Sequence, residues 1–316
     1  MRIVVTWSSG FIWYWVSRRL IELGHEVIGV DNENGYYGYL LKACRRSELE
    51  MLGNFKFHNI DIEEAKADIF EGADVVIHLA WQAGVRYSIE NPYEYIRSNI
   101  VGFHNIIHLA MEAGSKFIYA SSSSVYWNRT RTDRPESLYA ATKKSDELIA
   151  YSYSRIYWMS TIGLRFYTVY GPLWRPDMAI FKFADRIIRW EEIDIYNYGE
   201  MERDFTYIED IVEGIIAAID YECKYDVFNL GNSNPIKLGY LVELLEEEFW
   251  LEAKKNYMPL QKWDVLKTAA NIKHTKQRLW WSPKTCIEDW IKKFWEWYKH
   301  KRLNVNRKNF YFTLEK

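Results

Sequence analysis

The fold is decided near the start of the chain by the stretch Ile3-Val4-Val5-Thr6-Trp7-Ser8-Ser9-Gly10-Phe11-Ile12-Trp13. Its apolar beginning predicts a short buried strand, and the apolar spacing from Phe11 to Leu23 predicts a helix that ends at Gly24. A strand, a glycine-containing turn and a helix form the phosphate-binding turn of dinucleotide-binding folds. Asp31 follows the next predicted strand, about 20 residues after Gly10, where an acid can hold ribose hydroxyls.

Strand and helix signals alternate through the first half of the chain. We predict further strands at Glu26–Val30, Phe55–Ile60, Asp74–Leu79, Lys116–Ala120 and Thr161–Phe166, and helices at Tyr93–Ala113 and Leu138–Tyr157. This alternation is typical of an α/β fold with a Rossmann-like, doubly wound parallel sheet.

The alternation of strand and helix signals becomes less regular after about Pro172, which predicts a smaller C-terminal α/β lobe. Its expected strands are Ile193–Tyr196 and Val227–Leu230, and its expected helices are Leu238–Glu248 and Ile287–Lys299. We therefore expect residues 1–171 to form a dinucleotide-binding domain. Residues 172–316 should mainly form a substrate lobe, with some chain returning to the first domain.

Composition excludes several classes of protein. Of the 316 residues, 48% are hydrophobic and 27% charged, which excludes a mainly disordered chain. The net charge of −2 argues against a nucleic-acid partner. Three scattered cysteines fit neither a disulfide framework nor a zinc site, and His104 and His108 lack a third ligand, so no metal is expected. Because no signal peptide or long apolar run is evident, we expect a cytoplasmic protein without a membrane partner.

Tyr139 and Lys143 stand four residues apart on one predicted helix and so share a face. A tyrosine hydroxyl ionises near pH 10, too high for a general base at neutral pH. A neighbouring ammonium favours the phenolate and lowers that pKa. The pair therefore indicates acid–base chemistry at a hydroxyl group, although an exposed helical pair has the same spacing.

Several motifs together resemble the extended short-chain dehydrogenase/reductases. They are the turn at Thr6–Trp13, Asp31-Asn32, Asp61-Ile62, His78-Leu79-Ala80, Ser121–Tyr126 and Tyr139-Ala140-Ala141-Thr142-Lys143. Later blocks narrow the resemblance to UDP-glucuronate 4-epimerases. These are Ala83-Gly84-Val85-Arg86-Tyr87-Ser88, Gly163–Pro172, Arg175-Pro176-Asp177-Met178 and Arg203–Ile208. An ordered set of this length is far more specific than a lone pair of tyrosine and lysine.

The resemblance implies NAD as cofactor and a UDP-sugar as substrate. Tyr139 would remove the C4 hydroxyl proton while the C4 hydride passes to NAD⁺, and the hydride would return to the other face of the 4-keto sugar. Ser122 would bind the sugar O4, and Lys143 would also reach the nicotinamide ribose. The implied cofactor-binding residues are Gly10, Phe11, Ile12, Asp31, Asn32, Asp61, Ile62, Leu79, Ala80, Asn99, Tyr139 and Lys143.

The expected substrate is UDP-glucuronate, which the enzyme would convert to UDP-galacturonate. Family dehydratases and decarboxylases need acids where this chain has Ser123 and Ser124, so those reactions are disfavoured. Thr168 and Arg175 match positions that bind the uronate carboxylate, which an arginine fork suits. The implied substrate-binding residues are Arg86, Ser122, Ser123, Thr168, Arg175, Arg203 and Asp264. A UDP-glucose 4-epimerase and a non-catalytic sugar-nucleotide binder remain the alternatives.

Tryptophan is unusually common and glycine is scarce, with 15 and 16 residues. Against the family pattern, ten tryptophans replace typical glycines, at positions 7, 13, 127, 158, 174, 190, 250, 263, 280 and 290. Trp81 replaces an alanine or glycine, whereas Trp281 and Trp297 are typical of the family. Our hypothesis is that the gene contains UGA codons that its host reads as glycine. A chain that truly carries these tryptophans should bind a dinucleotide weakly or not at all, because an indole at position 7 would occupy ligand space.

Relatives in this family pair two helices from each subunit into a four-helix bundle. The predicted helices Tyr93–Ala113 and Leu138–Tyr157 match those helices. The resemblance therefore implies a homodimer.

Overall fold

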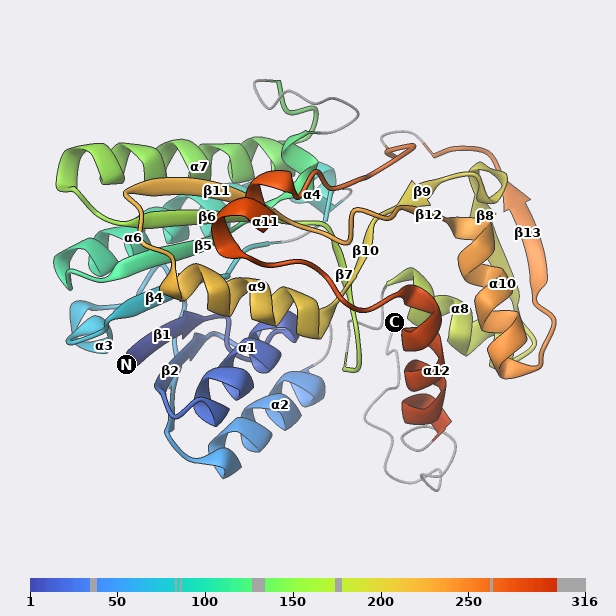
Figure 1. Cartoon of the computed structure of the whole chain (residues 1–316), viewed down its shortest axis with the longest axis horizontal. Coiled ribbons are helices and arrows are strands. Elements are labelled where there is room, and N and C mark those ends of the chain that lie inside the picture. The colour runs from blue at the N-terminus through green and yellow to red at the C-terminus, as the bar shows by residue number, and fades with distance from the viewer. Residues whose placement is uncertain are drawn as a thin grey trace.

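The computed structural model describes residues 1–34, 39–82, 84–85, 87–126, 134–173, 178–261 and 264–299. A parallel sheet with helices on both faces forms the larger part of the molecule, and a smaller lobe lies beyond the carboxyl ends of its strands (Figure 1). The fold class predicted from the sequence is confirmed.

The large sheet has seven parallel strands in the order β11-β6-β5-β4-β1-β2-β3. Their bounds are β1 (Arg2–Thr6), β2 (Glu26–Asp31), β3 (Phe55–Asn59), β4 (Val75–His78), β5 (Lys116–Ser122), β6 (Thr161–Phe166) and β11 (Tyr225–Leu230). Strand order reverses between β1 and β4. In open parallel sheets, ligands bind at the carboxyl ends of strands beside such a reversal.

Strand β11 belongs to the large sheet, although the sequence pattern groups it with the C-terminal lobe. It pairs with β6 in parallel register, from Tyr225 opposite Thr161 to Leu230 opposite Phe166. Phe228 and Leu230 are fully buried there. The chain therefore returns to the first half of the fold after it has entered the lobe.

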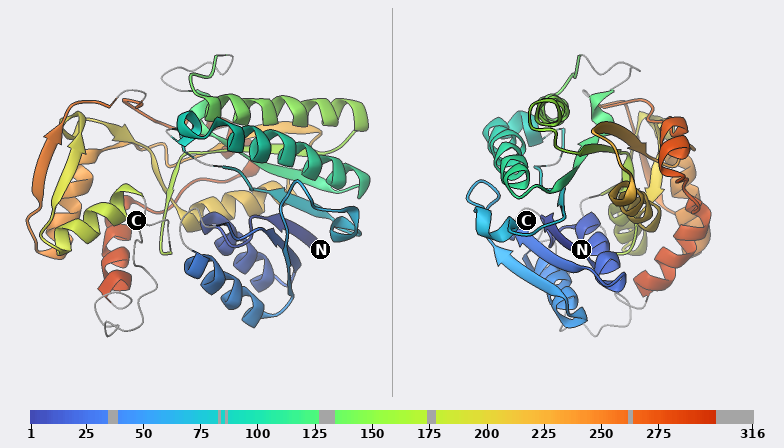
Figure 2. Two further views of the ribbon diagram at one scale, coloured as in Figure 1. Left: turned by 180° about the vertical axis from the view of Figure 1, so that it is seen from behind. Right: turned by 60° about the vertical axis from the view of Figure 1, so that its left-hand side comes forward.

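Helices cover both faces of the sheet (Figure 2). One layer contains α1 (Phe11–Glu22), α2 (Tyr39–Leu52) and α9 (Ile208–Asp220), and the other contains α6 (Phe103–Glu112) and α7 (Leu138–Tyr157). Shorter helices are α3 (Ala67–Phe70), α4 (Tyr87–Glu90) and α11 (Lys273–Leu279). The helix predicted at Tyr93–Ala113 consists of three consecutive pieces, α5 (Pro92–Tyr95), the π-helical η2 (Ile96–Gly102) and α6.

The lobe combines helices with short strand pairs. Its helices are α8 (Ala179–Ile188), α10 (Leu238–Phe249) and α12 (Ile287–Tyr298). The pairs are β7 (Thr168–Tyr170) with β10 (Phe205–Tyr207), β8 (Glu192–Tyr196) with β13 (Lys254–Met258), and β9 (Glu202–Arg203) with β12 (Ile236–Lys237). Short 3₁₀ turns lie at η3 (Ser123–Val125) and η4 (Asn197–Gly199).

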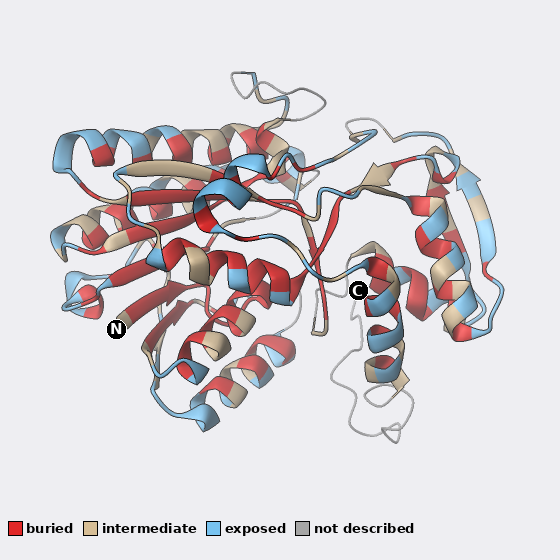
Figure 3. Cartoon of the chain, in the orientation of Figure 1, coloured by how far each residue is buried: buried red, intermediate tan, exposed pale blue. Residues whose placement is uncertain are grey.

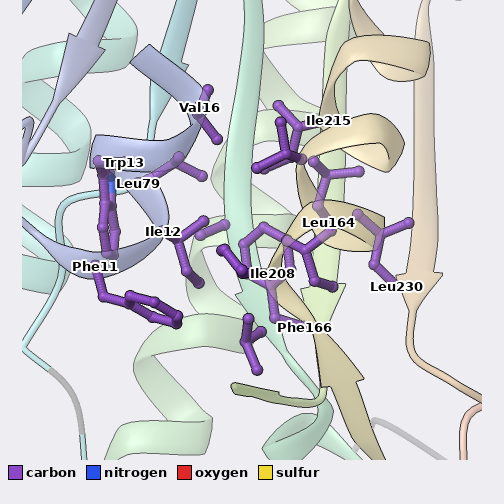
Figure 4. Close-up of a cluster of buried hydrophobic side chains, with 14 of the residues drawn as sticks. Phe11, Ile12, Trp13, Val16, Leu79, Leu164, Phe166, Ile208, Ile215 and Leu230 are labelled. Atoms are coloured by element: carbon purple, nitrogen blue, oxygen red, sulfur yellow. The ribbon is translucent and has the colours of Figure 1, made fainter. Parts of the chain in front are cut away.

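The core runs along the central strands and the inner faces of their helices (Figure 3). Ile12 from α1, Leu79 after β4, Phe166 from β6 and Ile208 from α9 belong to one cluster of buried side chains (Figure 4). This packing fixes α1 against the sheet, so the turn before α1 has a defined position. Among the described residues, the helices lack the length and apolar character needed to cross a membrane.

Candidate active site

The turn between β1 and α1 brings the backbone of Gly10 close to the side chain of Trp13. The N–H of Gly10 donates a hydrogen bond to the carbonyl oxygen of Trp7 at 2.8 Å. A Cβ atom on Gly10 would lie 2.5 Å from Cε3 of Trp13 and 3.1 Å from the carbonyl oxygen of Trp7, so a side chain here would force these neighbours to shift. The predicted cofactor residues Phe11 and Ile12 pack their side chains into the core. They can therefore offer a ligand only their backbone groups at the start of α1.

Asp31 ends β2 with its carboxylate turned toward this turn. Oδ2 accepts a hydrogen bond from the N–H of Ser9 at 3.0 Å, and Oδ1 accepts one from the N–H of Glu33 at 2.6 Å. Lys42 Nζ lies 3.7 Å from Oδ1, and both side chains are fully buried. Burial raises the pKa of Asp31, and the charge of Lys42 opposes that rise.

A small cavity lies where the carboxyl ends of β1, β2 and β4 meet. Its volume is only about 40 Å³. The residues predicted to bind the cofactor that line it are Asp31, Asn32, Asp61, Ile62 and Ala80. Asn32 donates a hydrogen bond to Asp61 Oδ2 at 3.2 Å. The structure thus brings together residues from three segments that are far apart in the sequence.

Three tryptophans pack against one another at this cavity. The ring centroids of Trp7 and Trp13 are 4.7 Å apart, those of Trp7 and Trp81 are 5.6 Å apart, and those of Trp13 and Trp81 are 5.1 Å apart. Trp7 and Trp81 also line the cavity. We name Trp7, Trp13 and Trp81 the indole cluster, which packs between the turn and the cavity.

The predicted cofactor residues Leu79, Ala80 and Asn99 take part in hydrogen bonds around the end of β4. Thr6 Oγ1 accepts hydrogen bonds from the N–H groups of Leu79 and Ala80, each at 3.2 Å. Asn99 is buried, and its Oδ1 accepts a hydrogen bond from the N–H of Gln82 at 2.7 Å. These contacts fix the chain that leaves β4.

The predicted catalytic residues come from β5 and α7, which pack together. Ser122 ends β5, and its Oγ accepts a hydrogen bond from the N–H of Ser124 at 3.2 Å. Tyr139 lies in the first turn of α7 and is buried, with its ring centroid 6.1 Å from that of Tyr95. Ser137 caps the helix, since its side chain accepts a hydrogen bond from the N–H of Ala140 at 3.1 Å.

Lys143 lies one turn after Tyr139 and is almost fully buried. Its Nζ is 2.7 Å from Oδ2 of Asp146 and 5.2 Å from the ring centroid of Trp81. Burial raises the pKa of Asp146 to about 7, and the ion pair with Lys143 opposes that rise. Burial, aided by the charge of Lys143, holds the pKa of His78 well below its usual value. The Lys143 ammonium therefore contacts Asp146 and the indole cluster in this structure.

Two predicted substrate residues of the lobe form a pair that the sequence does not reveal. Arg203 Nη2 donates a hydrogen bond to Oδ1 of Asp264 at 2.7 Å. Burial lowers the pKa of Arg203, and Asp264 opposes that effect. Thr168 begins β7, and its N–H donates a hydrogen bond to the carbonyl oxygen of Asp204 at 3.1 Å. Ser123 lies in the short turn after β5, and Arg86 and Arg175 lie outside the described residues.

Comparison with known proteins places this geometry in a family. Residues 3–231 match the NAD dependent epimerase/dehydratase family. The chain belongs to that family. It is 41% identical to the UDP-glucuronate 4-epimerase of Thermodesulfobacterium geofontis over 94% of this chain and 95% of that one. It is 42% identical to UDP-glucuronate 4-epimerase 4 of Arabidopsis thaliana over 94% of this chain and 75% of that one.

A solved structure gives the same result. The UDP-glucuronic acid 4-epimerase from Bacillus cereus, in complex with UDP-glucuronic acid and NAD, is similar with a TM-score of 0.89 and 28% identity. The match covers 95% of this chain and 99% of that one. The family's cofactor is NAD, and the prediction of this cofactor is confirmed.

The residues around the cavity fit NAD only in part. The carboxylates of Asp31 and Asp61 are suited to ribose hydroxyls, and the N-terminus of α1 is suited to a pyrophosphate. A pocket for a small ligand usually encloses about 300–1,000 Å³. The space of about 40 Å³ that the indole cluster leaves is far smaller. Trp7 and Trp81, which line this cavity, therefore narrow the space that the described residues would offer to the cofactor.

Sequence analysis missed the buried carboxylate of Glu147, which supports the serines at the end of β5. Glu147 Oε1 accepts hydrogen bonds from Ser121 Oγ and Arg165 Nε, both at 2.7 Å. Although burial alone would raise the pKa of Glu147, the hydrogen bonds from Arg165 and Lys144 lower it. The sequence around Glu147 does not reveal this role, because its partners Ser121 and Arg165 come from β5 and β6.

Proposed function

We propose that this protein is a UDP-glucuronate 4-epimerase that produces UDP-galacturonate. The observation that carries the proposal is that Ser122, Tyr139 and Lys143 occupy two packed elements next to the NAD cavity, in a chain of the epimerase/dehydratase family. The test is to incubate the protein from its native host with UDP-glucuronate and to separate the sugar nucleotides by chromatography. A steady mixture of the two epimers is expected, and unchanged UDP-glucuronate would contradict the proposal.

The chain's own residues supply the acid–base part of the reaction. Tyr139 takes the proton of the C4 hydroxyl and returns one to the inverted product, and Ser122 hydrogen-bonds the same oxygen. The Lys143 ammonium favours the phenolate form of Tyr139. NAD, when bound, accepts and returns the hydride, so none is consumed. Burial of Tyr139 excludes water from the proton transfer.

The carboxylate of the sugar is the feature that selects the substrate. A 4-keto uronic acid is a β-keto acid and loses CO₂ readily, so an epimerase must hold the carboxylate in an orientation that disfavours this loss. We assign this role to Thr168 and Arg175, with Ser122 and Ser123 as further donors. Arg203, paired with Asp264, is assigned to the diphosphate, and Asp264 lies near the uridine end. Arg86, which lies outside the described residues, is assigned to binding the sugar nucleotide.

Two arginine variants separate the uronate from a neutral sugar. Arg175→Ala should lower kcat/KM for UDP-glucuronate by about 10²-fold, because a charge-assisted hydrogen bond is worth about 1.5–3 kcal/mol. It should leave any reaction with UDP-glucose within about twofold. Arg203→Ala is the matched control and should weaken both reactions by raising KM. Equal loss on both substrates in Arg175→Ala would favour the UDP-glucose 4-epimerase alternative.

We further propose a division of labour in which residues 1–171 hold NAD and residues 172–316 mainly hold the UDP-sugar. The cytoplasmic location also stays a prediction, and fractionation of the host cells tests it. The non-catalytic alternative predicts sugar-nucleotide binding without conversion.

We also propose a homodimer formed through the helices Pro92–Glu112 and α7. Apolar side chains on these helices are exposed, namely Ile96, Val101, Leu148, Tyr151 and Ile156. Such a patch is typical of a protein–protein interface. A four-helix bundle made from two copies of this helix pair would cover it.

Introducing a charged side chain into this exposed apolar patch tests the proposed dimer. Leu148→Lys should shift the protein from dimer to monomer in analytical ultracentrifugation, because an interface core disfavours a buried unpaired charge. Leu266 lies on the lobe with 50% of its surface exposed, against 60% for Leu148, and provides the control Leu266→Lys, which should stay dimeric. A monomeric parent protein would contradict the proposal.

A further inference from the structure

Five tryptophans have a backbone conformation that favours glycine. Their φ angles are 63° at Trp7, 60° at Trp158, 60° at Trp190, 56° at Trp250 and 52° at Trp280. Only a few per cent of non-glycine residues have positive φ, and for a bulky side chain it is a true outlier. The structure describes twelve of the 15 tryptophans, so this background rate predicts fewer than one.

Four of the five lie at helix C-termini, three directly after the last helical residue and Trp190 one residue further on. Trp158, Trp190, Trp250 and Trp280 come after α7, α8, α10 and α11. After α8 the N–H of Trp190 donates to Ile187 O at 3.1 Å, and the N–H of Glu191 donates to Arg186 O at 2.8 Å. These two bonds define a Schellman motif with Trp190 at the position that glycine usually takes.

The same chain uses glycine in two matching motifs. After α1 the N–H of Gly24 donates to Ile21 O at 2.9 Å, and the N–H of His25 donates to Leu20 O at 3.0 Å. After α6 Gly114 and Ser115 repeat the pattern. The φ angles of Gly24 and Gly114 are 83° and 69°. Identical backbone motifs are therefore closed by glycine at some helix ends and by tryptophan at others.

Burial does not compensate for the strained backbone at these helix ends. The exposed fractions of Trp250 and Trp280 are 90% and 91%, and those of Trp158 and Trp190 exceed one half. Lysine ammonium groups lie over the rings of Trp158 and Trp190, at 4.5 and 4.8 Å from the centroids. An exposed cation–π contact of this kind is weak. The exposed indoles at these four positions therefore gain too little from packing to offset the strained backbone.

Hydrogen bonding of the indole N–H separates two sets of tryptophans that are buried or partly buried. Trp281 Nε1 donates to Asp210 O at 2.8 Å, and Trp15 Nε1 donates to Pro172 O at 3.2 Å. The Nε1 atoms of Trp13, Trp81 and Trp290 are buried and find no acceptor within the described part of the chain. Buried indoles usually have a hydrogen-bond partner. Trp13 and Trp81 also belong to the indole cluster that packs beside the NAD site.

We infer that the working protein carries glycine at positions 7, 13, 81, 158, 190, 250, 280 and 290, and that its gene specifies these residues with UGA codons. One reassigned codon accounts at once for the five left-handed tryptophans, the three indoles without acceptors and the narrowed cofactor site. Glycine at 7, 13 and 81 removes three ring systems from the cavity and leaves room for a dinucleotide. This inference depends on family membership and not on which sugar is the substrate.

The gene and the native protein provide the direct test. We expect UGA at the eight positions and UGG at Trp15, Trp281, Trp295 and Trp297, which serve as internal controls. Mass spectrometry of peptides from the protein made by its own host should show glycine at the eight positions and tryptophan at the four controls. UGG codons at the eight positions, or tryptophan in those peptides, would overturn the inference.

Two synthetic genes test the consequence for the cofactor. One encodes the chain with all its tryptophans, and the other encodes glycine at the eight positions and also at 127, 174 and 263, which follow the same family pattern. After purification and denaturation, the glycine protein should release at least tenfold more NAD per chain. Equal NAD content would overturn the claim that the indoles block the site. A glycine protein that holds NAD but leaves UDP-glucuronate unchanged would refute the proposed function and leave this inference intact.

Discussion

Replacing Tyr139 by phenylalanine should lower kcat for epimerisation by about 10³-fold, because the variant loses the group that takes the C4 proton. General acid–base catalysis typically contributes about 10²–10⁴-fold. The phenylalanine ring keeps the edge contact with Tyr95, whose centroid is 6.1 Å away, so the fold should not change. Variant and parent are both made from the synthetic gene that encodes glycine at the inferred positions. Their kcat values are measured at saturating UDP-glucuronate.

The control for this variant lies on the same helix. Tyr151 on α7 is half exposed and contacts Tyr225 through its ring, with 5.1 Å between the centroids. Tyr151→Phe should keep kcat within about twofold, since only a hydroxyl remote from the site is lost. NAD content should be equal in both variants and in the parent. A Tyr139→Phe protein that keeps more than a tenth of the parent kcat would show that another group transfers the proton.

Local sequence signals predicted much of the fold because most of its strands are short apolar runs. The bounds of α7 match the prediction at both ends, since Ser137 provides a cap that can be read from the sequence. The sequence predicted that some chain returns to the first domain but did not identify β11 as that chain, because the place of β11 depends on pairing with β6. Helix α2 was not predicted, although its apolar residues Leu41 and Leu49 are buried against the fold.

The candidate site shows the same limit at the level of single side chains. The carboxylates of Asp31 and Asp61 were predicted from motif positions, and both line one cavity. The pairing of Arg203 with Asp264 and that of Lys143 with Asp146 were not predicted. Arg203 and Asp264 are 61 residues apart and meet only through tertiary packing, so no local pattern encodes their pairing. Lys143 and Asp146 have the i,i+3 spacing of neighbours on α7, and sequence analysis overlooked this pair. In the sequence the tryptophans stood out only by composition and family pattern. The φ angles add a physical reason why several of these positions favour glycine.

A second large effect is expected in stability, at the helix ends Trp158, Trp190, Trp250 and Trp280. Starting from the chain with tryptophan, the variant with all four replaced by glycine should unfold at a temperature several degrees higher. Left-handed backbone costs an L-residue about 1–2 kcal/mol, and the greater freedom of glycine in the unfolded chain offsets about 0.4–1 kcal/mol of that gain. The net effect is about 0.5–1 kcal/mol per site.

These gains should add because the four sites end four different helices. Trp250→Gly and Trp280→Gly should contribute most, since their indoles are exposed and lose no cation–π contact. The control is Trp295→Gly inside α12, where the ring lies 4.4 Å from that of Phe249. Glycine there should lower the melting temperature, because it weakens the helix by about 1 kcal/mol and removes a packed ring. Thermal melting followed by circular dichroism measures both, and a fourfold variant that melts below its parent would mean that the indoles stabilise these helix ends.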